Sequence, residues 1–164
     1  MDIFLCEAKW WQVLHQKGGK ELPRIFILNG PNLNMLGKRE PEVYGKDTLT
    51  DLEQKLFQFA EGVQAELTFF QSNHEGDIID ALHEASDQYD GVVLNPGAFS
   101  HYSYAIRDAV AAISIPVIEV HISNPHAREE FRRQSVISPV ARGQITGLGF
   151  EGYKLAVCYF LNNK

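Results

Sequence analysis

Acidic, imidazole and hydroxyl side chains follow one another along an apolar run in a pattern that suits proton transfer. Glu119 and His121 are two residues apart, so an extended strand places both side chains on one side. A carboxylate in an otherwise apolar strand needs a polar partner, and it can accept an N–H from the histidine and fix the tautomer of the ring. His121 is therefore a candidate general acid. Ile122 and Ser123 follow, and their backbone N–H and hydroxyl could hold a carboxylate of a ligand.

Three arginines, Arg128, Arg132 and Arg133, lie in a charged segment for which we predict one or two helical turns over residues 127–134. We expect one of them to bind an anion, since a guanidinium group suits bidentate binding of a carboxylate. The others are expected to form ion pairs with the neighbouring glutamates. The net charge of −6 argues against a general nucleic-acid-binding surface, whereas a local cluster of Arg and His can still attract a small anion.

The stretch from Asn29 to Gly45 is long for a connection between a strand and a helix, and it holds a second group of candidates. Tyr44 is a poor base on its own, since a free tyrosine has a pKa of about 10. Arg39 lies earlier on the same loop, and a nearby guanidinium would favour the tyrosinate and lower that pKa. Tyr44 could instead pack beneath the loop. We interpret the stretch as an ordered but mobile lid that holds catalytic groups.

Polar residues follow each of the first four predicted strands, at the end where a doubly wound sheet binds its ligands. Asn occurs in all four connections and His in three, which predicts one common site. Asn95 could alternatively cap a turn, and His101 could be a core or capping histidine. Asp108 lies in the next helix, where it could face the site or support an interface. The candidates, strand by strand, are Asn29, Asn32, Arg39 and Tyr44, then Asn73, His74 and Glu75, then Asn95, Ser100 and His101, then His121, Ser123, Asn124 and Arg128.

These residues need a fold that brings the strand ends together. Short apolar runs predict strands at 25–28, 67–70, 91–94, 116–120 and 144–146, and apolar positions at helical spacing predict helices between them and over 155–161. Thr48 is the expected N-cap of the first helix, with Asp51 three residues on. The alternation, with central strands apolar on both faces, predicts an α/β fold: a flavodoxin-like, doubly wound sheet of five parallel strands in the order 2-1-3-4-5.

Length and composition favour a single soluble domain. The chain has 164 residues, 45% of them apolar and 22% charged, and no run approaches the length of a membrane span. Cys6 and Cys158 match no metal or redox spacing, and residues 1–6 lack the features of a secretory signal, so we expect a cytoplasmic location. We expect residues 1–23 to be an extension, either an appended segment or a partner-binding arm, and residues 24–164 to be one catalytic domain.

Two other binding motifs are weaker. Residues 147–152 match the dinucleotide fingerprint G-x-G-x-x-G, but they follow the last predicted strand, without the second strand and acidic residue that such a site requires. We interpret these glycines as a tight turn with close helix packing. Glu119, His121 and His101 could in principle bind a metal, but their spacing does not support it, so we predict no metal.

Taken together, the motifs resemble a known family. Residues 24–164 are similar to type II 3-dehydroquinate dehydratases, and the resemblance covers nearly the whole chain after the extension. The stretches that carry it are residues 29–34 (NGPNLN), 39–45 (REPEVYG), 71–76 (QSNHEG), 95–98 (NPGA), 101 (H), 119–124 (EVHISN) and 126–133 (HAREEFRR).

The resemblance implies a hydro-lyase with the flavodoxin-like fold, which removes water from 3-dehydroquinate by trans-elimination and gives 3-dehydroshikimate through an enolate. Tyr44 would be the base next to the ketone, and Arg39 would stabilise the tyrosinate and the developing charge. Asn32 would position a water on the enolate. His121 would protonate the departing hydroxyl, with Glu119 orienting it. The residues that would hold the substrate are Asn95, His101, Asp108, Arg132 and the Ile122–Ser123 pair.

The resemblance also implies no metal and no cofactor, a role in the shikimate pathway for aromatic (chorismate) biosynthesis, and a homo-oligomer, a dodecamer built from trimers. Two features depart from the family pattern. Tyr102 stands where many members have Thr and could alter a wall or an interface, and residues 1–23 have no counterpart. A non-catalytic flavodoxin-like module that binds a nucleotide or a flavin is the alternative function.

Overall fold

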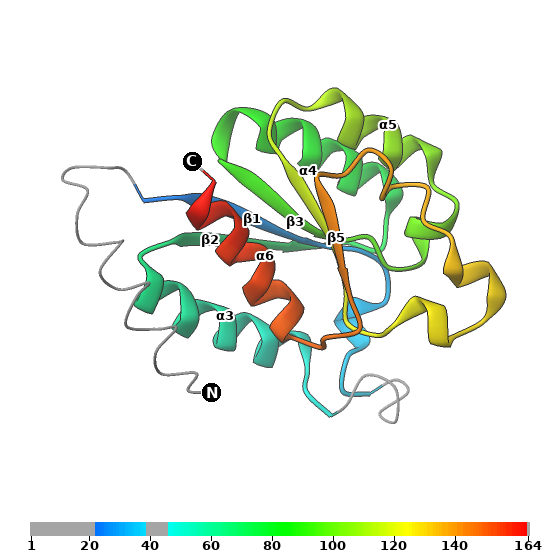
Figure 1. Ribbon diagram of the computed structural model, residues 1–164, viewed down its shortest axis with the longest axis horizontal. Helices are drawn as coiled ribbons and strands as arrows, with labels where there is room; N and C mark the ends of the chain where they lie inside the picture. Colours follow the sequence, from blue (N-terminus) through cyan, green and yellow to red (C-terminus); the bar gives the residue numbers. More distant parts are fainter. Residues whose placement is uncertain (1–21, 39–45, 164) are drawn as a thin grey trace.

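A computed structural model describes residues 22–38 and 46–163, which form one sheet covered by helices on both faces (Figure 1). The five strands are parallel and lie in the order β2-β1-β3-β4-β5. This order confirms the predicted flavodoxin-like, doubly wound topology. The strands are β1 (Arg24–Asn29), β2 (Glu66–Gln71), β3 (Gly91–Asn95), β4 (Val117–His121) and β5 (Gly143–Thr146).

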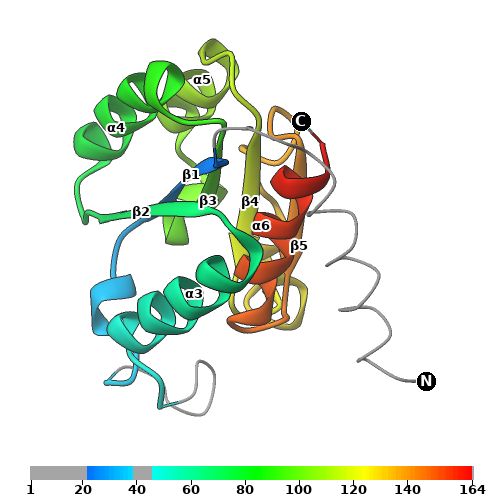
Figure 2. The same ribbon diagram turned by 90° about the vertical axis from the view of Figure 1, so that its left-hand side faces the viewer.

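The helices form a layer on each face of the sheet. One layer consists of α3 (Leu49–Val63) and α6 (Glu151–Asn162), and the other consists of α4 (Glu75–Gln88) and α5 (Tyr104–Ala112) (Figures 1 and 2). All four predicted helices are present, and α6 begins four residues before the predicted span. No helix among residues 22–38 and 46–163 is long and apolar enough to cross a membrane.

Alternation along the strands divides the core between the two layers. In β1, Ile25 and Ile27 pack with α3 and α6, whereas Phe26 and Leu28 pack with α4 and α5. Every residue of β3 and β4 is buried. Strands buried on both faces belong in the middle of a parallel sheet, which agrees with the central places of β1, β3 and β4.

The first turn of α3 is capped as predicted. Asp51 N donates to Oγ1 of Thr48 at 3.2 Å, and Thr48 N donates to Oδ2 of Asp51 at 2.7 Å. This capping box satisfies two backbone N–H groups that have no partner within the helix. The cap fixes the start of α3 at Leu49.

The charged segment after β4 is less regular than predicted. Two short 3-10 helices, η3 (Pro125–Ala127) and η4 (Glu130–Arg133), replace the expected one or two helical turns over 127–134. Asn124 begins η3 by accepting a hydrogen bond from His126 N at 3.0 Å through Oδ1. The break between the two 3-10 helices falls at Arg128 and Glu129, whose backbones are extended.

Candidate active site

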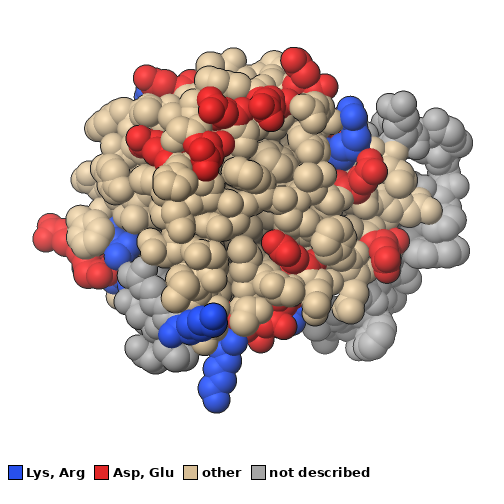
Figure 3. Space-filling model, turned by 180° about the vertical axis from the view of Figure 1, so that it is seen from behind, with Lys and Arg blue, Asp and Glu red and all other residues tan. Residues whose placement is uncertain are grey.

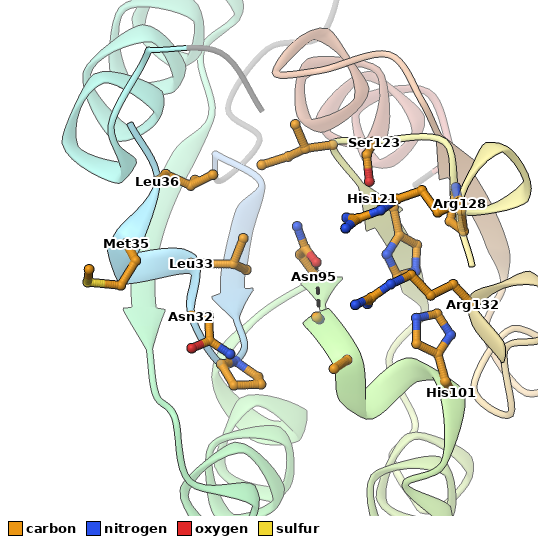
Figure 4. Close-up of a pocket in the computed structure, with 15 residues that line it drawn as sticks. Asn32, Leu33, Met35, Leu36, Asn95, His101, His121, Ser123, Arg128 and Arg132 are labelled. Atoms are coloured by element: carbon orange, nitrogen blue, oxygen red, sulfur yellow. Dashed lines mark hydrogen bonds between the residues drawn. The ribbon is translucent and has the colours of Figure 1, made fainter. Parts of the chain in front are cut away.

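A cavity of about 130 Å³ opens at the carboxyl ends of β1, β3 and β4 (Figure 4). Doubly wound sheets bind ligands at this edge, beside the point where the strand order reverses. One side of the cavity is apolar and contains η1 (Leu33–Met35) and Leu36, and the opposite side carries basic side chains. The polar residues that line it are Asn32, Asn95, His101, His121, Ser123, Arg128 and Arg132.

A larger cavity, of about 360 Å³, lies between β2 and α4, but its charge is unsuited to an anion. Asp77, Asp80 and Glu84 line it. Among the charged side chains on the face seen from behind, acidic ones are the more frequent (Figure 3). The arginines and histidines of the smaller cavity therefore stand out in a protein of net charge −6, and they make it the candidate anion site.

Glu119 and His121 form the predicted pair at the end of β4. Nε2 of His121 lies 2.8 Å from Oε1 of Glu119, whose side chain has no exposed surface. Two hydroxyls also donate to this carboxylate: Ser100 Oγ lies 2.5 Å from Oε1, and Ser135 Oγ lies 2.9 Å from Oε1 and 3.0 Å from Oε2. Because Nε2–H of His121 donates to Glu119, Nδ1 is the nitrogen left to exchange a proton with a ligand.

The surroundings of Glu119 keep the carboxyl group ionised. Burial alone raises the pKa of such a group, but the hydrogen bond and charge of His121, with the hydroxyls of Ser100 and Ser135, hold the pKa of Glu119 below its ordinary value. An ionised carboxylate in contact with the ring can stabilise the imidazolium that a general acid needs. The pair is therefore equipped to deliver a proton from His121.

His101, unlike His121, is set up to accept a hydrogen bond from a ligand. Its Nδ1–H donates to the carbonyl oxygen of Gln134 at 2.8 Å, which leaves the lone pair of Nε2 available. Partial burial, followed by the charges of His121 and Arg132, lowers the pKa of His101 below its ordinary value. The ring of His101 therefore stays neutral and can accept a hydrogen bond from a ligand hydroxyl. Its ring centroid lies 6.4 Å from that of His121.

Arg128 and Arg132 supply the positive charge of the cavity. Nε of Arg132 lies 2.9 Å from Oε2 of Glu129, and Nε of Arg128 lies 3.4 Å from the same oxygen. Both arginines line the cavity, whereas Arg133 lines only a neighbouring cavity of about 140 Å³, which Arg132 also reaches. Two arginines thus face the ligand space where one was expected, and they share one glutamate. Arg128 is an addition to the predicted substrate-binding set.

Asn32 reaches the cavity from an unusual backbone position. Its φ is 66°, in the left-handed region that Asn tolerates better than most residues. Its N–H donates to Oδ1 of Asn73 at 2.9 Å, and Nε2 of Gln71 donates to the same oxygen at 3.1 Å. Asn73 therefore holds the backbone of Asn32 in place and does not itself line the cavity. The expectation that four connections line the site is corrected to three, because His74 and Glu75 belong to the start of α4 and do not line the cavity.

Direct contact between the loops after β1 and β3 sets Asn32 relative to Asn95. Gly30 N donates to the carbonyl of Asn95 at 2.7 Å, and a Cβ at Gly30 would lie 2.7 Å from the backbone of Pro96. Only glycine permits this approach. Asn95 itself is 3% exposed, and its Oδ1 accepts a hydrogen bond from Gly97 N at 3.2 Å. Asn95 thus caps a turn and lines the cavity at once.

The glycine-rich segment after β5 supports the site from outside. The N–H of Gly147, where φ is 81°, donates to the carbonyl of His121 at 3.1 Å, and Gly149 N donates to the carbonyl of Ile122 at 3.0 Å. Both amides are engaged within the chain and are not free to bind a pyrophosphate. A Cβ at Gly152 would lie 3.3 Å from Ile145. The interpretation as a tight turn with close helix packing is confirmed.

Several sequence-predicted residues are not brought into the cavity. Asp108 has a side chain that is 74% exposed, and its Oδ1 accepts a hydrogen bond from Arg107 at 2.9 Å. Tyr102 is exposed and does not line the cavity, so it is not a wall of the site. Arg39 and Tyr44 lie outside the described residues, as do residues 39–45 of the predicted lid, whereas its first part, residues 29–38, is described and includes η1.

Ser135 contacts Glu119, and sequence analysis did not identify it. It lies 16 residues after Glu119 in irregular chain, where no periodic pattern marks it. Its Oγ accepts hydrogen bonds from the N–H groups of Ile137 at 3.1 Å and Ser138 at 2.9 Å, which direct its own hydrogen toward Glu119. Only the folded chain shows that this serine shares a carboxylate with Ser100.

Comparison with known proteins places this site in context. A family model described as dehydroquinase class II matches residues 23–161. A 3-dehydroquinate dehydratase of Bacillus licheniformis is 85% identical over 141 residues, which cover 86% of this chain and 97% of the relative. A 3-dehydroquinate dehydratase of Bacillus subtilis is 71% identical over 143 residues, with coverages of 87% and 97%. The crystal structure of a type II dehydroquinase from Butyrivibrio crossotus superimposes with a TM-score of 0.84 at 49% identity, covering 87% of this chain and 99% of that one.

Proposed function

The chain belongs to the class II dehydroquinase family, and from this premise we propose that it is a 3-dehydroquinate dehydratase, a hydro-lyase that converts 3-dehydroquinate to 3-dehydroshikimate and water. The observation that carries the proposal is the 85% identity to a dehydratase along almost its whole length. The cavity agrees with it, because a buried acid pair, Glu119 and His121, lies beside Arg132, and the substrate is a carboxylate that must lose a hydroxyl group.

The elimination breaks two bonds of the substrate and balances its protons. A base removes a proton from the carbon next to the ketone, and the electron pair moves onto the ketone oxygen as an enolate. The enolate then reforms the ketone, a carbon–carbon double bond forms, and the hydroxyl group leaves with a proton from an acid. The proton taken by the base must return to the acid before the next turnover. No redox partner is required.

His121 is the proposed acid. Its Nε2–H is committed to Glu119 at 2.8 Å, so the proton for the leaving hydroxyl comes from Nδ1. Loss of that proton leaves a neutral ring whose tautomer Glu119 still holds, and the ring is ready to be protonated again. Glu119 acts through His121, since it is fully buried and does not line the cavity.

Tyr44 is the proposed base, with Arg39 stabilising its tyrosinate; both assignments rest on the family motif at residues 39–45. Asn32 is the proposed holder of a water that donates to the enolate oxygen, which is supported by its place in the cavity wall. A donor aimed at developing charge stabilises the transition state more than the ground state. Base and acid would then act on the substrate from separate loops.

Substrate binding is assigned to side chains around the acid pair. We infer that Arg132 and His101 bind hydroxyl groups, and that Asn95 and the Ile122–Ser123 pair take the remaining oxygens, including the carboxylate. Asp108 belongs to this proposed set, but in one chain it is exposed on α5 outside the cavity. A homo-oligomer, a dodecamer built from trimers, would let Asp108 serve the cavity of a neighbouring subunit. We place the enzyme in the cytoplasm, in the shikimate pathway for aromatic (chorismate) biosynthesis.

The test follows the product, because 3-dehydroshikimate is a conjugated enone and absorbs in the ultraviolet. Purified protein mixed with 3-dehydroquinate is expected to give a steady rise in absorbance, insensitive to chelators and to borohydride added with substrate. Tyr44→Phe is expected to abolish the rise while substrate binding remains measurable by calorimetry. Absence of a signal from the unmodified protein would overturn the proposed function, and normal turnover by Tyr44→Phe would overturn the assignment of the base.

A further inference from the structure

Two neighbouring strands end in asparagines at the same register. Asn29 ends β1 and Asn95 ends β3, and the two residues are paired across the strands. Both continue the series of side chains that face α6, since Ile27 and Val93 pack in the layer of that helix. Tyr153 projects from the first turn of α6, and its side chain has no exposed surface. Three polar side chains thus meet beneath the cavity on the α6 face of the sheet.

The three side chains form one hydrogen-bonded chain. The Nδ2 of Asn95 lies 2.8 Å from the hydroxyl oxygen of Tyr153, and that oxygen lies 2.7 Å from Oδ1 of Asn29. A phenol has a single hydrogen to donate. It goes to Oδ1 of Asn29, so the phenol oxygen must accept from the Asn95 amide. Donation therefore begins at the Asn95 amide, which lines the cavity, passes through the phenol, and ends at the carbonyl oxygen of Asn29.

This direction fixes the orientation of the Asn95 amide. Its Nδ2 is bound to Tyr153, and its Oδ1 accepts from Gly97 N at 3.2 Å. Rotating the amide by half a turn would exchange nitrogen and oxygen and break both bonds. The second N–H of Asn95 and the free lone pair of its oxygen remain for the cavity that the residue lines, and Figure 4 shows the amide directed into that space.

We propose that Tyr153 is a positioning residue for catalysis: it holds the Asn95 amide in the one orientation that presents N–H to an oxygen of the substrate. The inference rests on the proposed function, and it adds a residue that does not itself line the cavity. Asn29 lies at the buried end of the same hydrogen-bonded chain and accepts the hydrogen of the phenol. Burial, above all, raises the pKa of Tyr153 above its ordinary value, so the hydroxyl remains a donor at any working pH.

Asn29 supplies the acceptor that the phenol needs. Tyr153 is fully buried, and its hydroxyl hydrogen goes to Oδ1 of Asn29 at 2.7 Å. An apolar residue at position 29 would leave that buried hydrogen unpaired and the phenol free to turn. The Glu119–His121 pair approaches the cavity from the other face, with Val117 and the α4–α5 layer, so the two devices are independent.

The decisive variant is Tyr153→Phe, which removes the hydroxyl and keeps the ring. Without the phenol, the Asn95 amide can turn, and KM for 3-dehydroquinate is expected to rise by about 10-fold, the worth of one oriented hydrogen bond, with a smaller change in kcat. Tyr159→Phe is the matched control on the same helix, because its hydroxyl accepts from Arg142 Nε at 2.8 Å at the surface. That control is expected to leave KM unchanged.

A double-mutant cycle separates positioning from a general loss of structure. In an Asn95→Ala background, Tyr153→Phe is expected to cause little further loss of kcat/KM, because Tyr153 acts through that amide. Equal losses with and without Asn95 would overturn the proposal, as would a Tyr153→Phe enzyme with the KM of Tyr159→Phe. Failure of the unmodified protein to turn over substrate would instead overturn the proposed function.

Thermal unfolding of each variant shows whether it is folded. If Tyr153→Phe does not fold, Asn29→Ala decides, since Asn29 does not line the cavity and its side chain is linked to the Asn95 amide through the hydroxyl of Tyr153. It frees the phenol hydrogen and is expected to raise KM in the same direction, again only when Asn95 is present. An Asn29→Ala enzyme with unchanged KM would then overturn the inference.

Discussion

The Nε2 atom of His121 lies 2.8 Å from Oε1 of Glu119, inside a strand whose other side chains are apolar. This bond assigns the two ring nitrogens different tasks, because one is held by the carboxylate and the other is left for the substrate. Two hydroxyl donors complete the shell of Glu119 and offset the cost of burying its charge. The proposed acid, His121, is thus held in one orientation before substrate arrives.

Glu119→Gln should remove most of the activity while the cavity keeps its shape. The amide can donate to Nε2 of His121, which would move the ring proton to the wrong nitrogen. We expect kcat to fall by about 100-fold or more, the typical contribution of a positioned general acid. Glu130→Gln, at an exposed position of η4, is the matched control and should retain normal turnover. Equal kcat values for the two variants would contradict the role of the pair.

The carboxylate of Glu119 should also make the free energy of unfolding depend on pH. The folded-state pKa of Glu119 is held below 4.5, the ordinary value, so its contribution is complete above pH 4.5 and is lost as pH falls through the lower, folded-state value. The free energy of unfolding of the native protein minus that of Glu119→Gln should therefore be level above this pH and decline below it. Urea unfolding from neutral pH to about pH 3 measures the difference. A difference that grows on acidification would contradict the direction of the shift.

Ser135→Ala should weaken the acid pair less severely. The variant removes one donor from a buried carboxylate, while His121 and Ser100 remain. A hydrogen bond to a charged group is worth about 1.5–3 kcal/mol, so we expect a loss of about 10-fold in kcat or more. Ser138→Ala is the control, because its hydroxyl makes one long bond, 3.5 Å, to the carbonyl of Ser135. A steady-state assay in which both variants match the unmodified enzyme would exclude Ser135 from the site.

Local patterns predicted the parts of the site that depend on local geometry. The period of a strand places Glu119 and His121 on one side, and the fold class places the strand ends of β1, β3 and β4 together. Thr48 was recognisable as a cap because its partner, Asp51, lies three residues away. In each case the information lies within a few residues or in the alternation of strands and helices.

The remaining contacts depend on long-range packing that no pattern carries. Tyr153 lies between the glycine-rich segment 147–152 and the predicted helix 155–161, where no pattern marks it, yet its hydroxyl contacts Asn29, 124 residues away. Asn73 follows a strand as a ligand residue would, but its side chain binds the backbone of Asn32. Helical spacing placed Asp108 in α5 without showing that the helix turns it away from its own cavity. Side-chain direction across layers is decided by tertiary contacts.

Asn32 allows backbone and side-chain roles to be separated with two variants. Asn32→Gly and Asn32→Ala both remove the amide and should lower kcat to a similar extent. Because φ is 66°, Asn32→Ala should also lose about 1 kcal/mol of stability relative to Asn32→Gly, which accepts the left-handed conformation without strain. Thermal unfolding and steady-state rates are measured on both. If kcat followed stability, with Asn32→Gly fully active, the side chain would have no part in the chemistry.

Arg132 and Arg133 are adjacent in sequence, but only Arg132 lines the cavity at the ends of β1, β3 and β4. Variants of the two residues can therefore separate the effect of charge from that of geometry. Arg132→Lys keeps the charge and loses the planar fork that Glu129 orients at 2.9 Å. We expect KM to rise by about 10-fold, because one charge-assisted hydrogen bond to the substrate is lost. Arg133→Lys should leave KM unchanged. If neither variant raised KM while added salt did, attraction by the net positive charge of the segment would replace the specific contact as the explanation.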